Sequence, residues 1–466
     1  MFLELIGRRN PCRAVIGVLN KQRPIAKWVE MDIKRLTSDK GLSKNSLVGT
    51  SVHQLLVGLV LVFSKAALSD ELLDINKAPV TIPLGGFQFA PVLEVSETYN
   101  DNIFRKNLLK RGSFLTQVHG GGELSYRKNR NRYGLTYAMQ SMSFHESAAD
   151  SYVDQYVGMN THSEFTSRNL LDFDLKYLKS HYQRGVFLGT DIASPLPQTP
   201  TPEAYHQYTL ASQYQYGHAN AKGNLRLTLN VDDYTFDNYF SNTVGYDRTQ
   251  YAVTPGFYYR MLPNTQLSAE VENKWANYKN NSWTSIDNNK QRFLVGGNWA
   301  YSTKLKARTR VGYVRLQLDN PNLKGFDDVT WDMGIQWTPK PYSQVMVDVT
   351  HDPIVSVGYI NGNIRTSDRF KLGWKHNWTP RITSELTGSF ENAYNTTLVR
   401  KDDYSSLGVE MNYGVQRWLG VGVSYTYNGL QSTNQTFIYD QNLFMVYVTG
   451  NPRISDEVKS PWATWY

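Results

Sequence analysis

Large apolar and polar residues alternate along most of the chain after residue 86. Between Phe87 and Val95, large apolar side chains fall on one face of an extended chain, while Gln88 and Glu94 fall on the other. Successive side chains of a strand point to opposite faces of a sheet, so a period of two indicates a strand with one apolar and one polar face. We predict such a strand here, ending in the turn formers of Tyr99–Asn102.

The same pattern recurs through the rest of the chain, and no segment of helical length shows a 3.6-residue period after Gly86. The clearest alternating runs are Asn224–Asp232, Val329–Trp337, Arg369–Trp378, Ser406–Val415 and Leu419–Asn428. Short polar connections alternate with longer ones. Counting eight short turns and nine long loops, we predict about 18 strands, within a range of 16–18. The predicted fold is all-β: a transmembrane antiparallel up-and-down β-barrel.

A soluble β-sandwich or propeller is the alternative, because soluble antiparallel sheets also alternate. Three features favour the membrane: strands longer than usual, loops of unequal length at the two ends, and aromatic residues at strand ends. The chain holds 31 Tyr, 19 Phe and 11 Trp, although its mean hydropathy is −0.47. Trp275, Trp337, Trp378 and Tyr394 lie at predicted strand ends, as the aromatic girdles of a membrane barrel require.

Charge and cysteine content exclude some classes of function. The net charge is +8, but residues 1–69 hold 11 basic and four acidic residues, whereas residues 70–466 hold 38 basic and 37 acidic ones. The basicity therefore belongs to the N-terminal leader, which argues against a body that binds nucleic acid. The single cysteine, Cys12, also lies in the leader. The remainder can form neither a disulfide nor a cysteine-based metal site.

Residues 1–69 are expected to be a leader with a signal peptide. The apolar core Leu55–Phe63 follows Lys40 and Lys44 and precedes Ala67–Ser69, the order of a secretory signal. The core is too short to span a bilayer as a helix; a buried helix of a cytosolic domain is the alternative. The segment before the core is long, so we expect the true start to lie downstream of Met1.

The rest of the chain divides into three parts. Residues 70–86 form a short periplasmic lead-in, residues 87–449 the barrel, and residues 450–466 a C-terminal tail. Tyr466 offers the terminal aromatic residue that barrel assembly uses, but Pro461 opposes a regular strand before it.

The end of the first strand carries a motif. The run Tyr99-Asn100-Asp101-Asn102-Ile103-Phe104 resembles the opening strand of the putative β-barrel porin 2 family, bacterial outer-membrane barrels associated with exopolysaccharide genes. The resemblance implies a location in the outer membrane of a Gram-negative bacterium and a role in passing an extracellular polysaccharide across it. It also implies contacts with outer-membrane lipid, with the barrel assembly machinery, and with polysaccharide and periplasmic export components.

If the apolar faces meet lipid, the polar faces line the interior. The candidate lumen-lining residues are Arg226, Lys306, Arg308, Arg310, Arg369, Lys371, Lys375, Glu270, Glu272, Asp332, Asp348 and Glu410. Rows of opposite charge in an aqueous channel create a transverse field that selects hydrophilic solutes. Equally, these charges could simply pair across the interior and fill it.

Catalysis has little support, and the chain is not predicted to be an enzyme. Glu270 and Glu272 share a strand face and could act as an acid/base pair, but lumen charges are the simpler interpretation. The histidines form no metal-ligand pair, and His351 and Asp352 would point apart on a strand. No cofactor, metal or catalytic site is predicted. The predicted function is a porin-like barrel that supports polysaccharide export; the alternatives are an uptake porin and, third, an outer-membrane enzyme or adhesin.

Overall fold

The computed structural model describes residues 79–184, 200–218, 221–239, 243–280, 286–322, 324–356, 363–395 and 400–451. The predicted signal peptide and nearly all of the predicted C-terminal tail lie outside these residues. Within them, no helix has the length and apolar character needed to cross a membrane.

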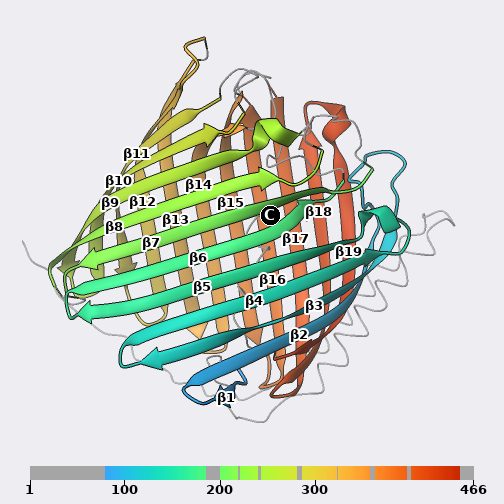
Figure 1. Cartoon of the computed structure of the whole chain (residues 1–466), viewed down its shortest axis with the longest axis horizontal. Coiled ribbons are helices and arrows are strands. Elements are labelled where there is room, and N and C mark those ends of the chain that lie inside the picture. The colour runs from blue at the N-terminus through green and yellow to red at the C-terminus, as the bar shows by residue number, and fades with distance from the viewer. Residues whose placement is uncertain are drawn as a thin grey trace, which may run out of the picture. The chain divides into compact units, whose positions relative to one another are not determined.

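In this part of the chain, 18 long antiparallel strands close into one barrel, as predicted (Figure 1). Each strand pairs with the next along the chain, and the last pairs with the first. A short strand β1 (Ile82–Leu84) adds a hairpin to β2. The barrel strands are β2 (Phe87–Asn100), β3 (Ser113–Lys128), β4 (Asn131–Phe144), β5 (Tyr152–Thr166), β6 (Asn169–Tyr182), β7 (Glu203–Tyr216), β8 (Gly223–Phe236), β9 (Arg248–Leu262), β10 (Thr265–Tyr278), β11 (Asn288–Ala300), β12 (Leu305–Leu318), β13 (Phe326–Lys340), β14 (Ser343–Ser356), β15 (Asn363–Asn377), β16 (Ile382–Asn395), β17 (Arg400–Gln416), β18 (Leu419–Ser432) and β19 (Tyr439–Gly450).

The alternation of the sequence sets the two faces of the barrel wall, with the apolar face outside. On β8, Leu225 is 55% exposed and Leu229 is 38% exposed, whereas the polar neighbour Asn224 is buried at 4%. A water-soluble protein would show the reverse. Lipid offers no partner for backbone amides, and a closed barrel pairs them all between strands, so this inverted pattern suits a membrane-spanning barrel.

The connections differ at the two ends of the barrel, as predicted. Eight connections have two to six residues, and five of these have only two, whereas the nine at the other end have up to 20 residues. Three of the long connections contain short 3₁₀ turns, η1 (Ala148–Asp150), η2 (Val244–Tyr246) and η3 (Gln435–Phe437). Short turns of outer-membrane barrels face the periplasm, so the long loops face outward.

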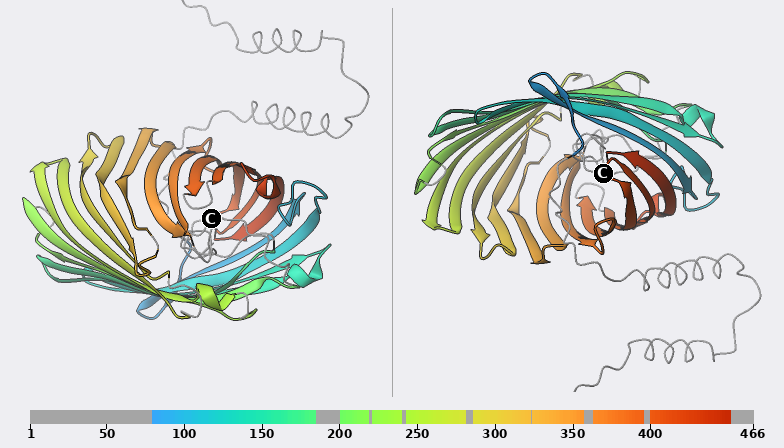
Figure 2. Two further views of the ribbon diagram at one scale, coloured as in Figure 1. Left: turned by 90° about the horizontal axis from the view of Figure 1, so that it is seen from above. Right: turned by 90° about the horizontal axis from the view of Figure 1, so that it is seen from below.

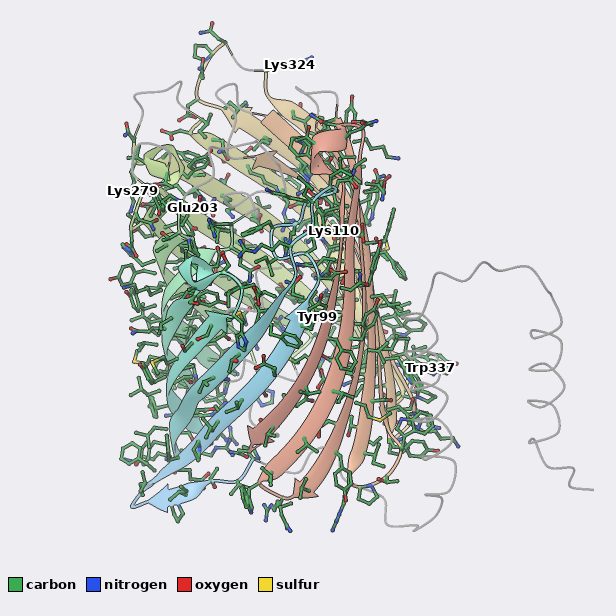
Figure 3. The ribbon with its side chains drawn as sticks, turned by 90° about the vertical axis from the view of Figure 1, so that its right-hand side faces the viewer. Tyr99, Lys110, Glu203, Lys279, Lys324 and Trp337 are labelled. Atoms are coloured by element: carbon green, nitrogen blue, oxygen red, sulfur yellow. The ribbon has the colours of Figure 1, made fainter. Side chains whose placement is uncertain are left out.

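Aromatic and basic side chains mark the two ends. Trp337 projects from the outer surface towards the short-turn end, and Lys279 and Lys324 lie at the long-loop end (Figure 3). Trp337 and Tyr99 are 48% and 43% exposed. Large amphipathic rings on the outer face at strand ends are the arrangement that membrane interfaces favour.

The barrel is not circular in cross-section (Figure 2). Strands β2–β8 form a broad, gently curved wall, and strands β10–β19 curl around to face it. We call these the broad wall and the curled wall. Strand β9 joins them on one side, and the seam between β19 and β2 joins them on the other.

The seam closes over only eight residue pairs, and side chains extend it at the long-loop end. The Asp101 carboxylate accepts hydrogen bonds from the backbone and the side-chain amide of Asn442, both at 2.7 Å. The buried Asn102 amide donates to the Asp440 carbonyl at 2.8 Å, and the Gln441 amide donates to the Asn102 carbonyl at 2.9 Å. We call this group the seam latch.

The latch corrects one prediction from the sequence. Tyr99 and Asn100 are not in a turn: they end strand β2, where they pair with Phe114 and Ser113 of β3. The turn begins at Asp101, two residues later than predicted. The polar motif is more than a turn. Besides a bond to its own backbone, its side chains form hydrogen bonds to residues of β19.

An asparagine also fixes the other end of the seam. The Asn451 side-chain amide donates to the carbonyls of Val80 and Pro91, and its oxygen accepts the Val80 N–H at 2.9 Å. Its φ of 57° is left-handed, a conformation that asparagine tolerates better than most residues. The segment before β1 is thereby attached beside the last strand.

Candidate functional site

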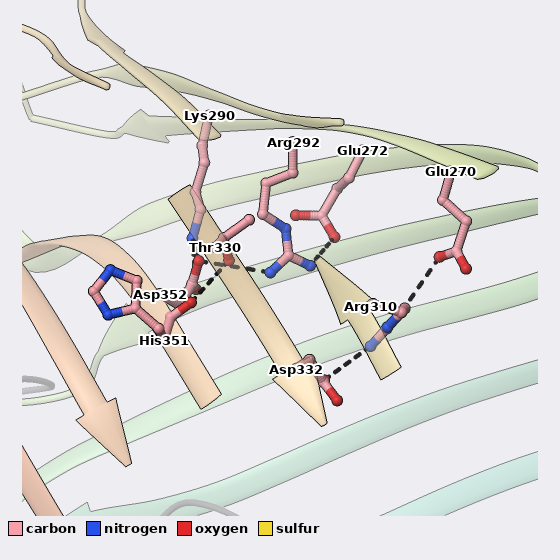
Figure 4. Close-up of polar contacts among 9 residues, drawn as sticks. All are labelled: Glu270, Glu272, Lys290, Arg292, Arg310, Thr330, Asp332, His351 and Asp352. Atoms are coloured by element: carbon pink, nitrogen blue, oxygen red, sulfur yellow. Dashed lines mark hydrogen bonds and ion pairs between the residues drawn. The ribbon is translucent and has the colours of Figure 1, made fainter. Parts of the chain in front are cut away.

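The interior face can be identified from contacts between strands that are not neighbours. Lys290 on β11 donates to both carboxylate oxygens of Asp352 on β14, at 2.6 Å each (Figure 4). On a flat sheet, residues three strands apart would be separated by about 14 Å. Only the concave face of a sharply curved wall brings them into contact, so both side chains lie inside the barrel.

The same face carries a series of ion pairs between strands β10 to β13. Arg292 contacts Glu272 at 2.8 Å. Arg310 contacts Asp332 on the neighbouring strand at 2.9 Å and Glu270, two strands away, at 3.3 Å (Figure 4). Glu270 and Glu272, which the sequence analysis interpreted as lumen charges rather than an acid/base pair, are both engaged by arginines. We call these contacts, with that of Lys290, the charge ladder.

The ladder continues towards the short-turn end through Arg308. Its guanidinium contacts Asp348 at 2.9 Å and Asp332 at 3.3 Å. The side chains of Arg308 and Asp348 are nevertheless 49% and 40% exposed. Because these residues lie on the interior face, their exposure means that they border solvent-filled space rather than a packed core.

The predicted basic row on β15 meets acidic residues of β16. Arg369 contacts Glu391 at 2.8 Å, and Lys375 lies 3.8 Å from Glu385. Arg365, which sequence reasoning did not select, also contacts Glu391 at 2.6 Å and is fully buried.

Two predicted lysines differ from this pattern. Lys306 and Lys371 make no hydrogen bond or ion pair with the described residues. Lys371 is the register partner of Asp348 on the interior face. The predicted rows of opposite charge are thus mostly paired with one another, with some cations left over.

The remaining two predicted residues bind uncharged partners. Glu410 accepts a hydrogen bond from the Tyr447 hydroxyl at 2.5 Å. The Tyr447 ring lies over Gly422, where a Cβ atom would come within 2.3 Å of it, so only glycine admits the ring there. Arg226 donates to the Gln215 side chain at 3.0 Å and stacks 4.0 Å above the Tyr258 ring.

Two cavities lie along this face. One, of about 420 Å³, is lined by Lys290, Arg292 and Glu272 of the charge ladder, among others. The other, of about 780 Å³, lies at the short-turn end and is lined by Arg226, Lys306 and Arg308, among others. The interior thus offers hydrated space bordered by fixed charges and amides.

The long-loop end of the broad wall is different. Its interior side carries a buried aromatic cluster made of Tyr156, Tyr205, Tyr234 and Phe236, with Ala138 and Leu178. The rings of Tyr205 and Tyr234 stack with centroids 4.6 Å apart, and those of Tyr234 and Phe236 meet edge-on at 5.3 Å. Phe236 is only 2% exposed. Sequence reasoning missed this cluster because it assigned the non-lipid face to polar residues.

Other residues were missed although the sequence held a signal. Lys290 and Arg292 share the interior face of β11 with Asn288, and their spacing of two could have identified them. Asp352 was considered only together with His351. As predicted, these two side chains point apart: Asp352 binds Lys290, whereas the His351 Nδ1 atom lies 2.7 Å from Asp368.

Two carboxylates in the long loops are held by local contacts. Arg184 contacts Asp150 at 2.5 Å, and the hydrogen bond with this carboxylate raises the pKa of the guanidinium. Burial raises the pKa of the Asp247 carboxyl, while the hydrogen bond from the Phe236 N–H opposes the shift. Among the residues that the structure describes, no three His, Asp or Glu side chains are grouped so as to hold a metal ion.

The closed barrel, its lipid-facing apolar surface and its charged, hydrated interior define the class: a porin-like β-barrel of the outer membrane. The sequence matches the family described as Putative beta-barrel porin 2 over residues 77–451, and the chain belongs to this family. The resemblance inferred from the Tyr99–Phe104 motif is thereby confirmed.

Three solved structures are distantly similar to this chain. OprD of Pseudomonas aeruginosa is 12% identical, with 82% of this chain and 98% of that chain covered and a TM-score of 0.39. OccK2 (OpdF) of the same organism, solved in complex with glucuronate, is 10% identical, covering 78% and 98%, with a TM-score of 0.43. A BenF-like porin from Pseudomonas fluorescens is 10% identical, covering 77% and 97%, with a TM-score of 0.42. No curated protein matches the sequence.

Proposed function

We propose that this chain forms a water-filled channel across the outer membrane and that an extracellular polysaccharide passes outward through it. The observation that carries the channel is the exposure of interior ion pairs: Arg308 and Asp348 contact each other and yet remain 49% and 40% exposed. Charges on an interior wall stay this exposed only where water reaches them. A barrel of 16–18 strands is wide enough for such a channel.

Family membership supports the choice of cargo, together with the chemistry of the interior. The charge ladder offers guanidinium donors and carboxylate acceptors within a few ångströms of one another. A chain of sugar units presents hydroxyl groups that can donate and accept, so it can exchange hydrogen bonds with both as it moves. Outer-membrane lipid, the assembly machinery and periplasmic export components are the proposed partners.

Uptake of small hydrophilic solutes is the second candidate. The mixed charges of the ladder, with Arg310 between Glu270 and Asp332, would also suit small polar solutes. Nothing in a hydrated interior sets the direction of transport. The two functions therefore differ in the size of the transported molecule rather than in the type of channel. An experiment can separate them by asking whether a polysaccharide blocks the current through the channel.

Conductance of the refolded protein in a planar bilayer tests the proposal. We expect stable current steps that the host's polysaccharide blocks and neutral unrelated glycans do not. Steps that are indifferent to the polysaccharide would favour the uptake porin. A folded barrel without current steps would show that the chain forms no open channel and would refute the proposal.

Two arginines of one strand provide a matched pair of variants. Arg308→Gln removes an interior charge of β12 and should change the conductance or ion selectivity. Arg315→Gln removes a charge from the outer face of the same strand, where Arg315 contacts Asp327 and both side chains are about half exposed. The second variant should leave the conductance unchanged. Equal effects of the two variants would argue against conduction along the interior charges.

A further inference from the structure

We infer that the larger cavity, at the short-turn mouth of the barrel, binds oxyanions carried on hydrophilic solutes, with the carboxylates of acidic saccharides as the preferred class. This inference rests on the proposed channel and names the chemistry of its periplasmic entrance. It begins from the lining of this cavity of about 780 Å³, which includes Arg226, Arg260, Lys306 and Arg308 but one acidic residue, Asp348.

Two of these cations, Arg226 and Lys306, form no ion pair with an acidic residue in the described part of the chain. The one acidic residue of the lining, Asp348, contacts Arg308 at 2.9 Å, and Arg308 also contacts Asp332 at 3.3 Å, so the excess does not come from Arg308. Lys306 makes no hydrogen bond or ion pair with the described part of the chain. The partners of the Arg226 guanidinium are uncharged: it donates to the Gln215 amide oxygen at 3.0 Å and lies 4.0 Å above the centre of the Tyr258 ring. The cavity therefore keeps a positive excess.

The second cavity shows that this excess is local. Its volume is about 420 Å³, and its lining has four basic and three acidic residues: Arg248, Lys274, Lys290 and Arg292 against Asp232, Glu272 and Asp352. Its charges are nearly balanced, and Lys290 is bonded to Asp352. A concave site with low-dielectric walls concentrates the field of its net charge. Positive potential is thus focused at the short-turn mouth rather than spread along the interior.

The arginine side chain in this cavity favours binding of a carboxylate over binding of a simple halide. A guanidinium presents a planar fork of N–H donors that fits carboxylate or phosphate oxygens. Stacking on Tyr258 fixes the plane of the Arg226 fork, so little side-chain entropy remains to be lost on binding. Lys306, from strand β12, supplies a flexible point charge to the same cavity. Free phosphate shares this chemistry, and the experiment separates the two sources.

The first measurement is block of the bilayer current by trigalacturonate added to the short-turn side. We expect concentration-dependent block, with maltotriose inactive at the same concentration and the reversal potential in a KCl gradient favouring anions. Inorganic phosphate provides the second arm: block by phosphate as strong as that by trigalacturonate would mean a general oxyanion site and would overturn the saccharide assignment. Absence of block by either would overturn the site while leaving the channel intact.

Matched variants locate the site. Arg226→Gln combined with Lys306→Gln should weaken the block at least about tenfold, the size expected for losing one or two charge-assisted hydrogen bonds. Lys274→Gln removes an interior cation that lines the balanced cavity instead, and it should keep the block within about twofold because distant sites act independently. Equal weakening by both variants would show a diffuse charge effect and contradict a localised site.

A binding measurement separates failure of this inference from failure of the channel. Titration calorimetry of the folded protein in detergent with trigalacturonate needs no current. Binding that the double variant abolishes would support the site even if the barrel conducts nothing. A conducting barrel that binds no trigalacturonate in either assay would refute the site and leave the proposed channel standing.

Discussion

The two walls of this barrel obey one alternation rule and yet use their interior faces differently. On the curled wall, interior positions hold the charge ladder, whose cations and carboxylates pair with one another and remain exposed towards the short-turn end, at Arg308 and Asp348. At the long-loop end of the broad wall, interior positions hold the aromatic cluster, in which Tyr205, Tyr234 and Phe236 are each at least 94% buried. Strand alternation thus decides which side chains face inward but not whether the inward side is wet.

Local covering explains the difference. Tyr246 of the η2 turn packs against Phe236 with ring centroids 6.2 Å apart, and the Asp247 carboxylate that follows accepts the Phe236 N–H at 2.8 Å. The long loop after β8 therefore folds against the inner side of its own strand, and apolar rings there gain from exclusion of water. The charge ladder lies nearer the middle of the barrel and borders cavities instead. A membrane barrel can therefore contain both a channel wall and a small hydrophobic core.

The largest expected effect is in the aromatic cluster. Phe236→Ala should lower the free energy of unfolding by about 3–5 kcal/mol, because it removes a fully buried ring and leaves a cavity. Urea unfolding of the refolded barrel in detergent measures the change. Phe236→Leu is the matched control and should lose much less, since it keeps most of the apolar volume. If the two variants are equally stable, the cluster does not pack as a core.

The second largest expected effect is at Arg365, the buried arginine of strand β15. Arg365 is fully buried and contacts Glu391 at 2.6 Å, while Arg369 also contacts Glu391. Arg365→Met should destabilise the barrel by up to about 3 kcal/mol, less than for complete loss of a buried pair because Arg369 remains. Arg308→Gln, in the hydrated part of the same wall, should change stability by no more than about 1 kcal/mol. Similar losses in unfolding experiments would contradict the distinction between buried and hydrated charges.

Variants of the seam latch test whether its side chains help to hold the two walls together. Asn102→Ala should destabilise the barrel by about 1 kcal/mol, because it removes the buried amide that donates to the part-buried Asp440 and Lys106 carbonyls. Asn102→Asp keeps an acceptor for the Lys106 N–H but loses both donors, and it should be nearly as unstable. Hydrogen exchange at the ends of β2 and β19 would show whether the seam opens first. Unchanged exchange there would mean that backbone pairing alone closes the barrel.

The smallest expected effect is on the pH dependence of stability, through Asp247 in the loop that covers the aromatic cluster. Burial raises the native pKa of Asp247 above its ordinary value of 3.8, with Lys279 and His206 nearby opposing the shift. The native state then binds more protons than the unfolded state above pH 3.8, so this group's contribution to stability falls as pH rises through the native pKa. Asp247→Asn should flatten that part of the stability profile. An unaltered profile would mean that the carboxyl titrates normally.

The strands, their number and their lipid-facing side could all be predicted from the amino-acid sequence. Runs such as Leu225–Val231 and Val329–Trp337 alternate because lipid and water lie on opposite sides of one strand, and that requirement is local. The alternation of short and long connections was equally readable. The Asn-Asp-Asn motif pointed to the family, although its bonds to β19, about 340 residues away, were not visible in it.

Which interior residues meet, and which are shielded from water, depends on the closed barrel and could not be predicted from the sequence. Lys290 and Asp352 are 62 residues apart in the sequence. They meet only because the pairing register of the strands between β11 and β14 and the strong curvature of the wall bring the two side chains together. Likewise, Tyr234 and Phe236 occupy positions that the pattern assigned to a polar face, and a loop packing onto them makes those positions a core. Alternation is a property of one strand, whereas curvature, register and loop packing are properties of the closed barrel. For that physical reason the sequence predicted the wall, and only the fold revealed the two kinds of interior.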